Sequence, residues 1–352
     1  MIVAGAGMAG LAAAVRAREL GLRPRVYEKG THCGGSMRAS SGVVWRHREW
    51  DAFRRECPAG EPALQRLVFE RLDDALAWLR ALGAPVVAEG TGNPRTAGVR
   101  FDPRGLADTL ARRAGGVSLG SPAPLPESEL VLLATGGFGG SPELVERYVR
   151  PSAPLRLRAN PWSTGDGLRH ALARGAALSA GMDEFYGRNM PDTPWTEAEY
   201  VSAAQLYAAR ARIFDERGVE FFRAADVSWS ETNVVQATAR RPGAAAYYLL
   251  DAEALADPAV AARAGPLLPP DALPFPAPAG TAAAVRVVAS ITHTIGGVRV
   301  DERARVLRGD GTPVDGLLAA GVDAGGVAAG GYASGLAQAL VLGLAAAETA
   351  AG

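Results

Sequence analysis

The sequence predicts an α/β fold built on a parallel β-sheet, and three glycine-rich turns carry that prediction. Each turn follows a short apolar strand, the first at residues 2–4, the second at 130–135 and the third at 317–321. A glycine turn at the carboxyl end of a buried strand is typical of open parallel sheets, which bind their ligands at that edge. We therefore expect a Rossmann-type sheet with a ligand at the ends of its strands.

The first turn has the spacing Gly-x-Gly-x-x-Gly over residues 5–10. Gly5 permits the tight turn, and Gly7 leaves no side chain between the backbone and a pyrophosphate. Gly10 lets the helix expected at residues 8–20 pack close to the strand. The N–H groups and the positive dipole end of that helix then point at the phosphate.

An acidic residue ends the next strand, as dinucleotide binding requires. The strand at residues 25–27 leads to Glu28, whose carboxylate is suited to accept both hydroxyls of an adenosine ribose. The loop at 33–42 is small, polar and glycine-rich, which suits close approach to a large flat ligand, although a flexible connector is the alternative. Together these features predict a bound dinucleotide; a turn needed only for strand–helix packing is the other interpretation.

Composition excludes several classes of partner. The 352 residues contain 37 basic and 37 acidic side chains, so no general attraction to nucleic acid or to an anionic membrane is expected. Cys33 and Cys57 are too far apart for a redox or metal pair, and no metal site is predicted. With a strand beginning at residue 2 and no apolar run of about 20 residues, we expect no signal peptide, no membrane span and a cytoplasmic location.

The remaining periodicity places further elements along the chain. The helices expected outside the first turn cover residues 61–82, 105–114, 168–174, 230–240 and 336–349. Strands are expected at 207–214 and 246–250. Composition changes from residue 161, and the proline- and alanine-rich stretch 257–280 is interpreted as a hinge or wrapping loop.

Seven sequence blocks together match a known family. They read GAGMAG, YEK, GGSMRASSG, ATGGFGG, STGDG, ITHTIGG and GLLAAGVDAGG, in family order along the chain. The combination closely resembles the flavoprotein-subunit family of fumarate reductase and succinate dehydrogenase, in the branch that also contains 3-ketosteroid dehydrogenases and tricarballylate dehydrogenase. The resemblance implies FAD as the dinucleotide. It also implies a glutathione-reductase-like FAD-binding domain from residues 1–160 and 281–352, with an α+β cap for substrate inserted at 161–280.

The resemblance assigns cofactor contacts residue by residue. They are Gly5, Ala6, Gly7, Met8, Ala9, Gly10, Glu28, Lys29, Gly34, Gly35, Ser36, Met37, Ser41, Gly42, Ala134, Thr135, Gly136, Asp166, Gly321, Asp323, Gly335, Leu336 and Ala337. Two departures stand out. Residues 118–129 replace the β-meander that the family places before its ATGG strand, so the chain is a shortened member. The loop with the motif GGSMRASSG, residues 34–42, is called the GGS loop below. It lacks the histidine that some relatives use to attach FAD, which predicts a non-covalent flavin.

Two C-terminal residues and two cap residues are the candidates for chemistry. His293 resembles the family's substrate-anchoring histidine; a structural imidazole is the alternative. Tyr332 stands where fumarate-type members carry a carboxylate-binding arginine, and it resembles the tyrosine with which ketosteroid dehydrogenases polarise a ketone. Tyr186, with Arg188 lowering its pKa, is the candidate base, and a packing aromatic is an equal alternative.

These residues predict an FAD-dependent dehydrogenase or reductase of CH–CH groups. We expect it to act on the C–C bond beside a carbonyl of a small, ketone or steroid-like molecule, by desaturation or by ene-reduction. A fumarate reductase-like dicarboxylate oxidoreductase and a flavin-binding protein without turnover are the alternatives. The expected partners are the substrate and an electron donor or acceptor, and the sequence leaves the direction of the reaction open.

Overall fold

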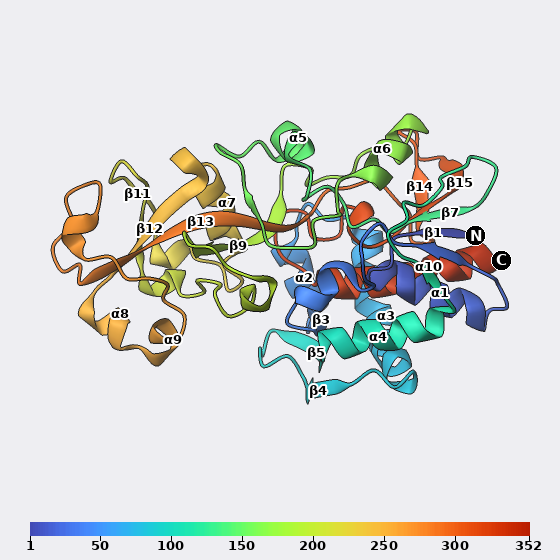
Figure 1. The fold of residues 1–352 in the computed structure, drawn as a ribbon, viewed down its shortest axis with the longest axis horizontal. Coiled ribbons are helices and arrows are strands. Elements are labelled where there is room, and N and C mark those ends of the chain that lie inside the picture. The colour runs from blue at the N-terminus through green and yellow to red at the C-terminus, as the bar shows by residue number, and fades with distance from the viewer. The chain divides into compact units, whose positions relative to one another are not determined.

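The computed structural model describes residues 1–352, and the chain divides into two compact units. Unit 1 comprises Met1–Leu144, Asn160–Glu184 and His293–Gly352, and unit 2 comprises Val145–Ala159 and Phe185–Thr292. Both chain termini belong to unit 1 (Figure 1). The predicted limits place residues 161–184 in the cap and residues 145–159 and 281–292 in the FAD-binding domain. Here 161–184 group with unit 1, where Asp166 bonds to Lys29, and the other two segments group with unit 2.

The main sheet of unit 1 is parallel except at one edge, which confirms the predicted fold class. Its order is β14-β15-β7-β1-β2-β6, and only the β14–β15 pair is antiparallel. The strands are β1 (Ile2–Ala4), β2 (Arg25–Tyr27), β6 (Val117–Ser118), β7 (Val131–Leu133), β14 (Arg305–Leu307) and β15 (Pro313–Ala319). In register, Ile2 lies between Arg25 and Val131. The carboxyl ends of β1, β2, β7 and β15 therefore meet at one edge of the sheet.

Two helices pack directly against each other beside this sheet. They are α1 (Met8–Glu19) and α10 (Gly335–Ala351), which lie side by side in Figure 1. Gly343 of α10 faces the backbone of α1 so closely that a Cβ there would lie 2.5 Å from the Ala9 carbonyl oxygen. The alanine-rich composition of both helices permits this close approach.

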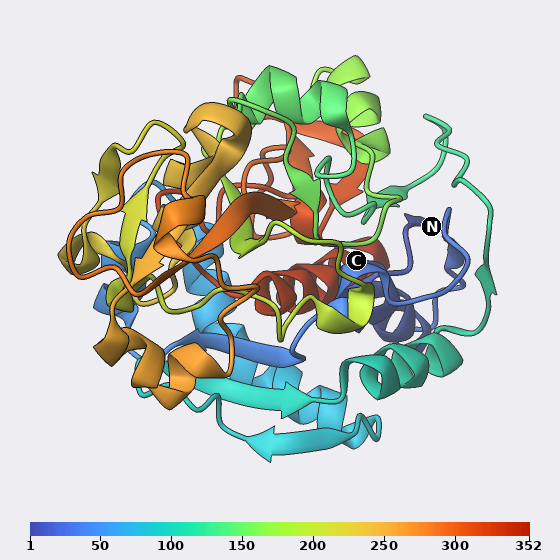
Figure 2. The same ribbon diagram turned by 60° about the vertical axis from the view of Figure 1, so that its left-hand side comes forward.

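A second, antiparallel sheet lies in the N-terminal part of unit 1 and was not predicted. It has the order β3-β5-β4, with β3 (Val43–His47), β4 (Val86–Glu89) and β5 (Thr96–Phe101). Figure 2 shows β4 and β5 as the cyan strands at the bottom of the view. The helices α2 (Trp50–Glu56), α3 (Pro62–Ala81) and α4 (Pro103–Ala114) complete this part of the unit, with α6 (Asp166–Ala173) further along the chain. The helix predicted at 61–82 is thereby confirmed, and its buried face includes Leu64, Leu72 and Leu79.

Unit 2 is built on a mixed sheet of its own. The order is β11-β10-β12-β13-β8, with β9 also paired to β13. Its strands are β8 (Arg156–Leu157), β9 (Phe185–Pro191), β10 (Arg212–Phe214), β11 (Glu220–Phe222), β12 (Ala245–Leu250) and β13 (Ala283–Thr294), the last of which ends in unit 1. The helices are α7 (Thr232–Ala239), α8 (Ala252–Ala256) and α9 (Pro258–Ala261). Tyr248, Val285 and Val287 lie in its core.

Two predictions in unit 2 need correction. The strand expected at 207–214 is reduced to β10, because only Arg212–Phe214 pairs with β12 and Ala208–Arg210 forms a 3₁₀ turn. No strand was expected at Phe185–Pro191, which forms β9 and carries Arg188 with 9% of its surface exposed. None of the helices has the length and apolar character needed to cross a bilayer.

Candidate functional site

In the first glycine turn, the fold leaves no room for a side chain at Gly5 or Gly10 but leaves room for one at Gly7. Gly5 has φ +107°, and a Cβ there would overlap the carbonyl oxygen of Ala134. A Cβ on Gly10 would overlap the carbonyl oxygen of Gly5. At Gly7, the N-cap of α1, a Cβ would meet no protein atom within 4 Å, and no side chain caps the helix. The backbone at Gly7 therefore borders open space at a helix N-terminus, as an anion site requires.

Glu28 is a buried carboxylate at the end of β2. It is 8% exposed and accepts hydrogen bonds from the Ala6 N–H at 2.9 Å and from the Gly30 N–H at 2.6 Å. The bond from Ala6 ties the acid to the first glycine turn, and the bond from Gly30 fixes it to the backbone that follows β2. Since an ionised carboxylate has about four acceptor positions, it retains capacity for ribose hydroxyls.

The GGS loop lies directly against the first glycine turn. The Gly34 N–H donates to the Ala6 carbonyl oxygen at 2.7 Å, and Gly34 has φ +106°. A Cβ on Gly35 would lie 3.5 Å from the Cα of Gly7. The structure thus brings two of the predicted cofactor motifs together, although Met37 in the same loop is 3% exposed and packs inward.

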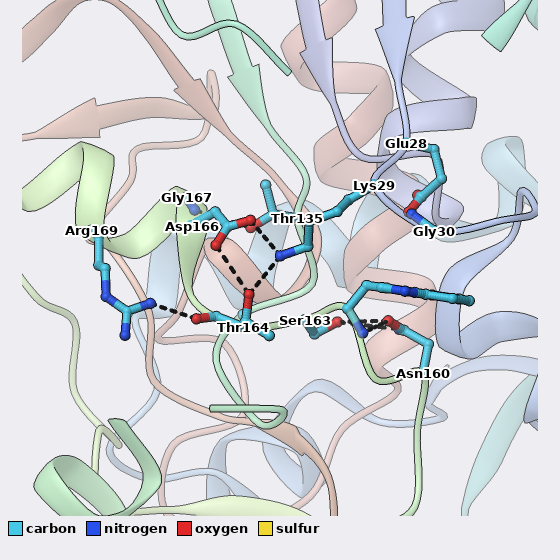
Figure 3. A network of polar contacts seen from close by, with 12 residues as sticks. Glu28, Lys29, Gly30, Thr135, Asn160, Ser163, Thr164, Asp166, Gly167 and Arg169 are labelled. Carbon is cyan, nitrogen blue, oxygen red and sulfur yellow. Dashed lines mark hydrogen bonds and ion pairs between the residues drawn. The ribbon is translucent and has the colours of Figure 1, made fainter. Parts of the chain in front are cut away.

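Figure 3 shows a polar network that joins the end of β2 to the segment before α6. The Lys29 ammonium donates to the Thr164 hydroxyl and to the Asp166 carboxylate, both at 2.6 Å. Asp166, predicted to contact the cofactor, is therefore already engaged by another predicted cofactor residue. Both side chains are partly exposed, so the pair adds little stability by itself and mainly orients the two groups.

Asn160 extends this network to the GGS loop, and sequence reasoning missed it. Its amide Nδ2 donates to the Ser36 hydroxyl at 2.7 Å. It also donates to the Ser163 hydroxyl at 3.2 Å (Figure 3). The neighbouring Trp162 ring lies against Gly30, where a Cβ would be 2.5 Å from the ring. Asn160 and Ser36 are 124 residues apart, so no local pattern announces their contact.

The second glycine turn is held by Asp323, a buried acid from the C-terminal segment. Asp323 is 2% exposed and accepts from the Thr135 N–H, from the Thr135 hydroxyl at 3.0 Å and from the Gly137 N–H at 3.2 Å. Burial raises its pKa to about 6, and the bonds from Thr135 and Gly137 oppose that shift. The structure thus gives the carboxylate a role in fixing this turn, and its predicted contact with the flavin remains a prediction.

Both C-terminal candidates, His293 and Tyr332, lie near the start of α10. Gly335 opens the helix, and a Cβ there would lie 3.0 Å from Nε2 of His293. His293 Nδ1 lies 3.1 Å from the Thr294 carbonyl oxygen, which only accepts, so Nδ1 carries the proton and Nε2 the lone pair. Burial lowers the pKa of His293, which favours this neutral form.

Tyr332 lies one turn before α10. Its ring belongs to an aromatic group that also contains Trp45, His47, Trp50, Phe53 and Phe69. Its ring centroid is 5.3 Å from that of Trp45, and its carbonyl oxygen is 3.2 Å from Nε2 of His47. Ser334, two residues on, caps α10 by accepting from the Ala337 N–H at 3.2 Å. Gly321, two residues after β15, is tied to the same helix through Gln338, whose amide donates to the Gly321 carbonyl oxygen at 3.0 Å.

The cap candidates lie in unit 2, on β9. The Arg188 guanidinium carbon is 4.9 Å from the centroid of the Tyr186 ring, and Arg188 donates to the Ser230 carbonyl oxygen. The hydroxyl of Ser290 in turn donates to the Arg188 carbonyl oxygen at 2.7 Å. Burial raises the pKa of the nearby Glu231 carboxyl to about 7, and the charge of Arg188 opposes that shift.

The unit 1 residues fit an FAD. Every residue predicted to contact the cofactor belongs to unit 1. The open backbone at Gly7 would receive a pyrophosphate and the buried Glu28 a ribose, both at the carboxyl ends of parallel strands.

The comparisons with known proteins agree with this fit. The sequence profile of the family described as FAD binding domain matches residues 1–126 and 95–336. No curated protein gives a significant match to the sequence.

Several solved structures share the fold at low sequence identity. A flavocytochrome c3 fumarate reductase in an open conformation is 21% identical with a TM-score of 0.76, over 99% of this chain and 77% of that one. The 3-ketosteroid Δ4-(5α)-dehydrogenase of Rhodococcus jostii RHA1 is 19% identical with a TM-score of 0.75, over 100% and 96%. The 3-ketosteroid Δ1-dehydrogenase of Sterolibacterium denitrificans is 17% identical with a TM-score of 0.74, over 99% and 98%. With the profile covering most of its length, the chain belongs to the FAD binding domain family and is an FAD-dependent oxidoreductase.

Proposed function

We propose that this protein is a dehydrogenase or ene-reductase that acts on the C–C bond beside the carbonyl of a small ketone, of steroid-like or similar apolar character. The observation that carries the proposal is Tyr332, a tyrosine one turn before α10, with its ring beside Trp45. A phenol offers one hydrogen-bond donor, which suits a single carbonyl oxygen, whereas a carboxylate favours the bidentate fork of an arginine.

Three arginines of unit 2, Arg188, Arg210 and Arg212, give little support to a dicarboxylate substrate. Arg210 lies 3.4 Å from Asp257, and Arg212 lies 2.6 Å from Glu220. Both guanidinium side chains are more than half exposed, as solvated surface pairs are. Arg188 is buried but donates to a backbone carbonyl. Two of the similar structures, both ketosteroid dehydrogenases, hold a steroid dione, which makes a ketone one candidate substrate.

The proposed chemistry assigns a separate task to each residue. When bound, FAD supplies the two-electron chemistry. The Tyr332 hydroxyl donates to the carbonyl oxygen of the substrate, and this bond strengthens as charge gathers on that oxygen while the adjacent C–H bond breaks. His293 presents Nε2 as an acceptor, which suits it to orient a hydroxyl or enol of the substrate. For the proton of that C–H bond, Tyr186 stays our predicted base, with the Arg188 guanidinium carbon 4.9 Å from the centroid of its ring.

A substrate screen of the FAD-loaded protein tests the proposal. Steroid 3-ketones and cyclohexenones should turn over with a dye acceptor or a reduced dye donor, and they should perturb the flavin absorption spectrum. Fumarate and succinate at millimolar concentration should do neither. Efficient fumarate reduction would contradict the ketone proposal and favour the dicarboxylate alternative, and a protein inert toward every compound would favour a flavin-binding role.

Replacing Tyr332 by Phe tests the residue that carries the proposal. Loss of one preorganised donor should lower turnover on the best ketone by about 10²–10³-fold, with little change in apparent substrate binding. FAD content, read from absorbance, should stay the same. The matched control is Tyr148→Phe in unit 2, which should leave turnover within about twofold.

We also propose that the flavin is held without a covalent bond. The GGS loop offers Ser36 and Met37 rather than an attachment histidine. Acid or heat should therefore release FAD intact into the supernatant. A flavin that stays with the denatured chain after precipitation and washing would overturn this proposal.

A further inference from the structure

The turn that carries Tyr332 is held from two sides by β3 and α2. On the β3 side, Nε2 of His47 lies 3.2 Å from the Tyr332 carbonyl oxygen, and the backbone N–H of Trp45 donates to the Ser334 hydroxyl at 3.4 Å. On the α2 side, a Cβ on Gly331 would overlap the carbonyl oxygen of Glu56. The backbone around Tyr332 therefore has little room to shift.

The ring of Tyr332 is held separately from its backbone. Its centroid lies 5.3 Å from that of Trp45 at an interplanar angle of 52°, and Trp45 is 7% exposed. Such tilted aromatic contacts favour one ring orientation over others. A half-buried tyrosine without this neighbour would have more freedom about its two side-chain torsions.

His47 is itself fixed within the aromatic group. It is 3% exposed, its ring stacks on Phe53 with centroids 5.0 Å apart, and the Trp45 ring meets it edge-on at 5.3 Å. Because a carbonyl oxygen only accepts, Nε2 of His47 carries the hydrogen in its contact with Tyr332. Burial lowers the pKa of His47, so the neutral ring with this single tautomer persists at neutral pH.

We propose that Trp45 and His47 are positioning residues for Tyr332. His47 holds the backbone of the tyrosine, and Trp45 sets the direction in which its hydroxyl points. The proposal rests on the proposed function, because it assumes that the Tyr332 hydroxyl contacts a substrate carbonyl. A displacement of about 1 Å in such a donor is enough to reduce turnover by about 100-fold.

Single variants of Trp45 and His47 test whether an aromatic ring or a hydrogen-bond donor is needed at each position, or only a side chain of similar size. Trp45→Leu should lower kcat on the best ketone by about 10–100-fold with KM within about threefold, while Trp45→Phe, which keeps a ring, should retain kcat within about threefold. His47→Leu should lower kcat in the same way, and His47→Gln, which keeps a donor, should restore most of it. The control is Trp50→Leu, in the same aromatic group, where the ring packs on Phe53 and Phe69 and kcat should stay within about threefold.

A double-mutant cycle with Tyr332→Phe gives the decisive measurement. If Trp45 acts through the Tyr332 hydroxyl, Trp45→Leu should have no further effect once that hydroxyl is gone, so the double variant should match Tyr332→Phe. Effects that multiply would overturn the proposal, and so would a Trp45→Leu enzyme with full turnover while Tyr332→Phe is impaired. Unaltered turnover in Tyr332→Phe would instead refute the catalytic role assigned under the proposed function.

A spectroscopic readout tests the contact without any turnover. In FAD-loaded protein labelled with 3-fluorotyrosine, the ¹⁹F signal lost in Tyr332→Phe identifies Tyr332. That signal should move in Trp45→Phe and move further or broaden in Trp45→Leu, because the ring current of the indole is changed or removed. A signal unchanged in both variants would overturn the proposal even if the substrate were never found.

Discussion

At the scale of single residues, the glycines of the first turn separate the needs of the fold from those of the ligand. A side chain on Gly5 or Gly10 would overlap backbone carbonyl oxygens, so the fold itself requires both glycines. A side chain on Gly7 would meet no protein atom within 4 Å. We therefore propose that Gly7 leaves room for the pyrophosphate of the cofactor.

Replacing Gly7 by Ala should spare the fold and weaken the cofactor. We expect the unfolding free energy of the apoprotein to fall by no more than about 1 kcal/mol, the range for a poorer N-cap. FAD affinity should fall by about 1–3 kcal/mol, because the added methyl group crowds the phosphate. Denaturant unfolding and titration of the apoprotein with FAD measure the two quantities. Gly309→Ala, also in open space, is the control and should change neither; an unchanged affinity in Gly7→Ala would contradict the assignment.

The buried acid Asp323 predicts a pH dependence of stability. Its pKa is about 6 in the folded protein against an ordinary value of 3.8, so the folded chain binds more protons between these values. This group therefore adds stability at acid pH, and the contribution is lost as the pH rises through about 6, by roughly 3 kcal/mol in total.

The difference in unfolding free energy between wild type and Asp323→Asn isolates that contribution. It should shift by up to about 3 kcal/mol in favour of the variant between pH 4 and pH 7, as measured by denaturant unfolding at several pH values. Asp310→Asn is the control, since Thr312 lowers the pKa of this exposed acid and no such trend is expected. A difference that stays constant with pH would refute the assigned ionisation.

At the scale of elements, the start of α10 joins the helix, β3 and the turn of Tyr332. The Ser334 hydroxyl accepts from the backbone N–H of Ala337 at 3.2 Å and from the backbone N–H of Trp45 at 3.4 Å. It thereby satisfies a donor of the helix N-terminus and a donor of the strand. The residue is 6% exposed, so water does not readily replace it.

Ser334→Ala should lower the free energy of unfolding by about 1–2 kcal/mol, because two buried N–H groups lose their acceptor. Thermal or denaturant unfolding of the FAD-loaded protein measures the change. Ser334→Asn, another favourable N-cap, should recover part of the loss. The exposed Ser202→Ala should change stability by less than about 0.5 kcal/mol, and an equal loss in both alanine variants would argue against the cap.

At the scale of the whole molecule, the chain crosses between two units while the predicted cofactor contacts stay in one. Unit 1 gathers three separate segments, and each of them contributes residues to the FAD motifs. FAD binding should therefore stabilise unit 1 selectively. At a free concentration of 100 times Kd, the stabilisation is about 2.7 kcal/mol.

Hydrogen exchange read by mass spectrometry tests this selectivity. Adding FAD to the apoprotein should slow exchange in peptides covering 1–42, 131–140 and 321–340. Peptides from the β10–β11 hairpin of unit 2 serve as the internal control and should change less. Equal protection across both units would show that FAD orders the whole chain rather than unit 1.

Local patterns in the sequence were sufficient for the parallel sheet, the glycine turns and the FAD family. Turn glycines and strand–turn–helix alternation act over a few residues, and for that reason β1, α1, β7 and α10 were predicted close to where they lie. The matching family profile supports the same conclusion.

Only the tertiary structure decided which residues surround the candidate site. The sheet β3-β5-β4 was missed, and its His47 meets Tyr332 from 285 residues away. Asp323, whose flavin contact remains a prediction, accepts three hydrogen bonds at the second glycine turn, and no local pattern indicated these bonds. Such contacts depend on burial, which desolvates a histidine or a carboxylate, and on long-range packing, which determines its hydrogen-bond partners. Neither effect leaves a periodic trace in the sequence.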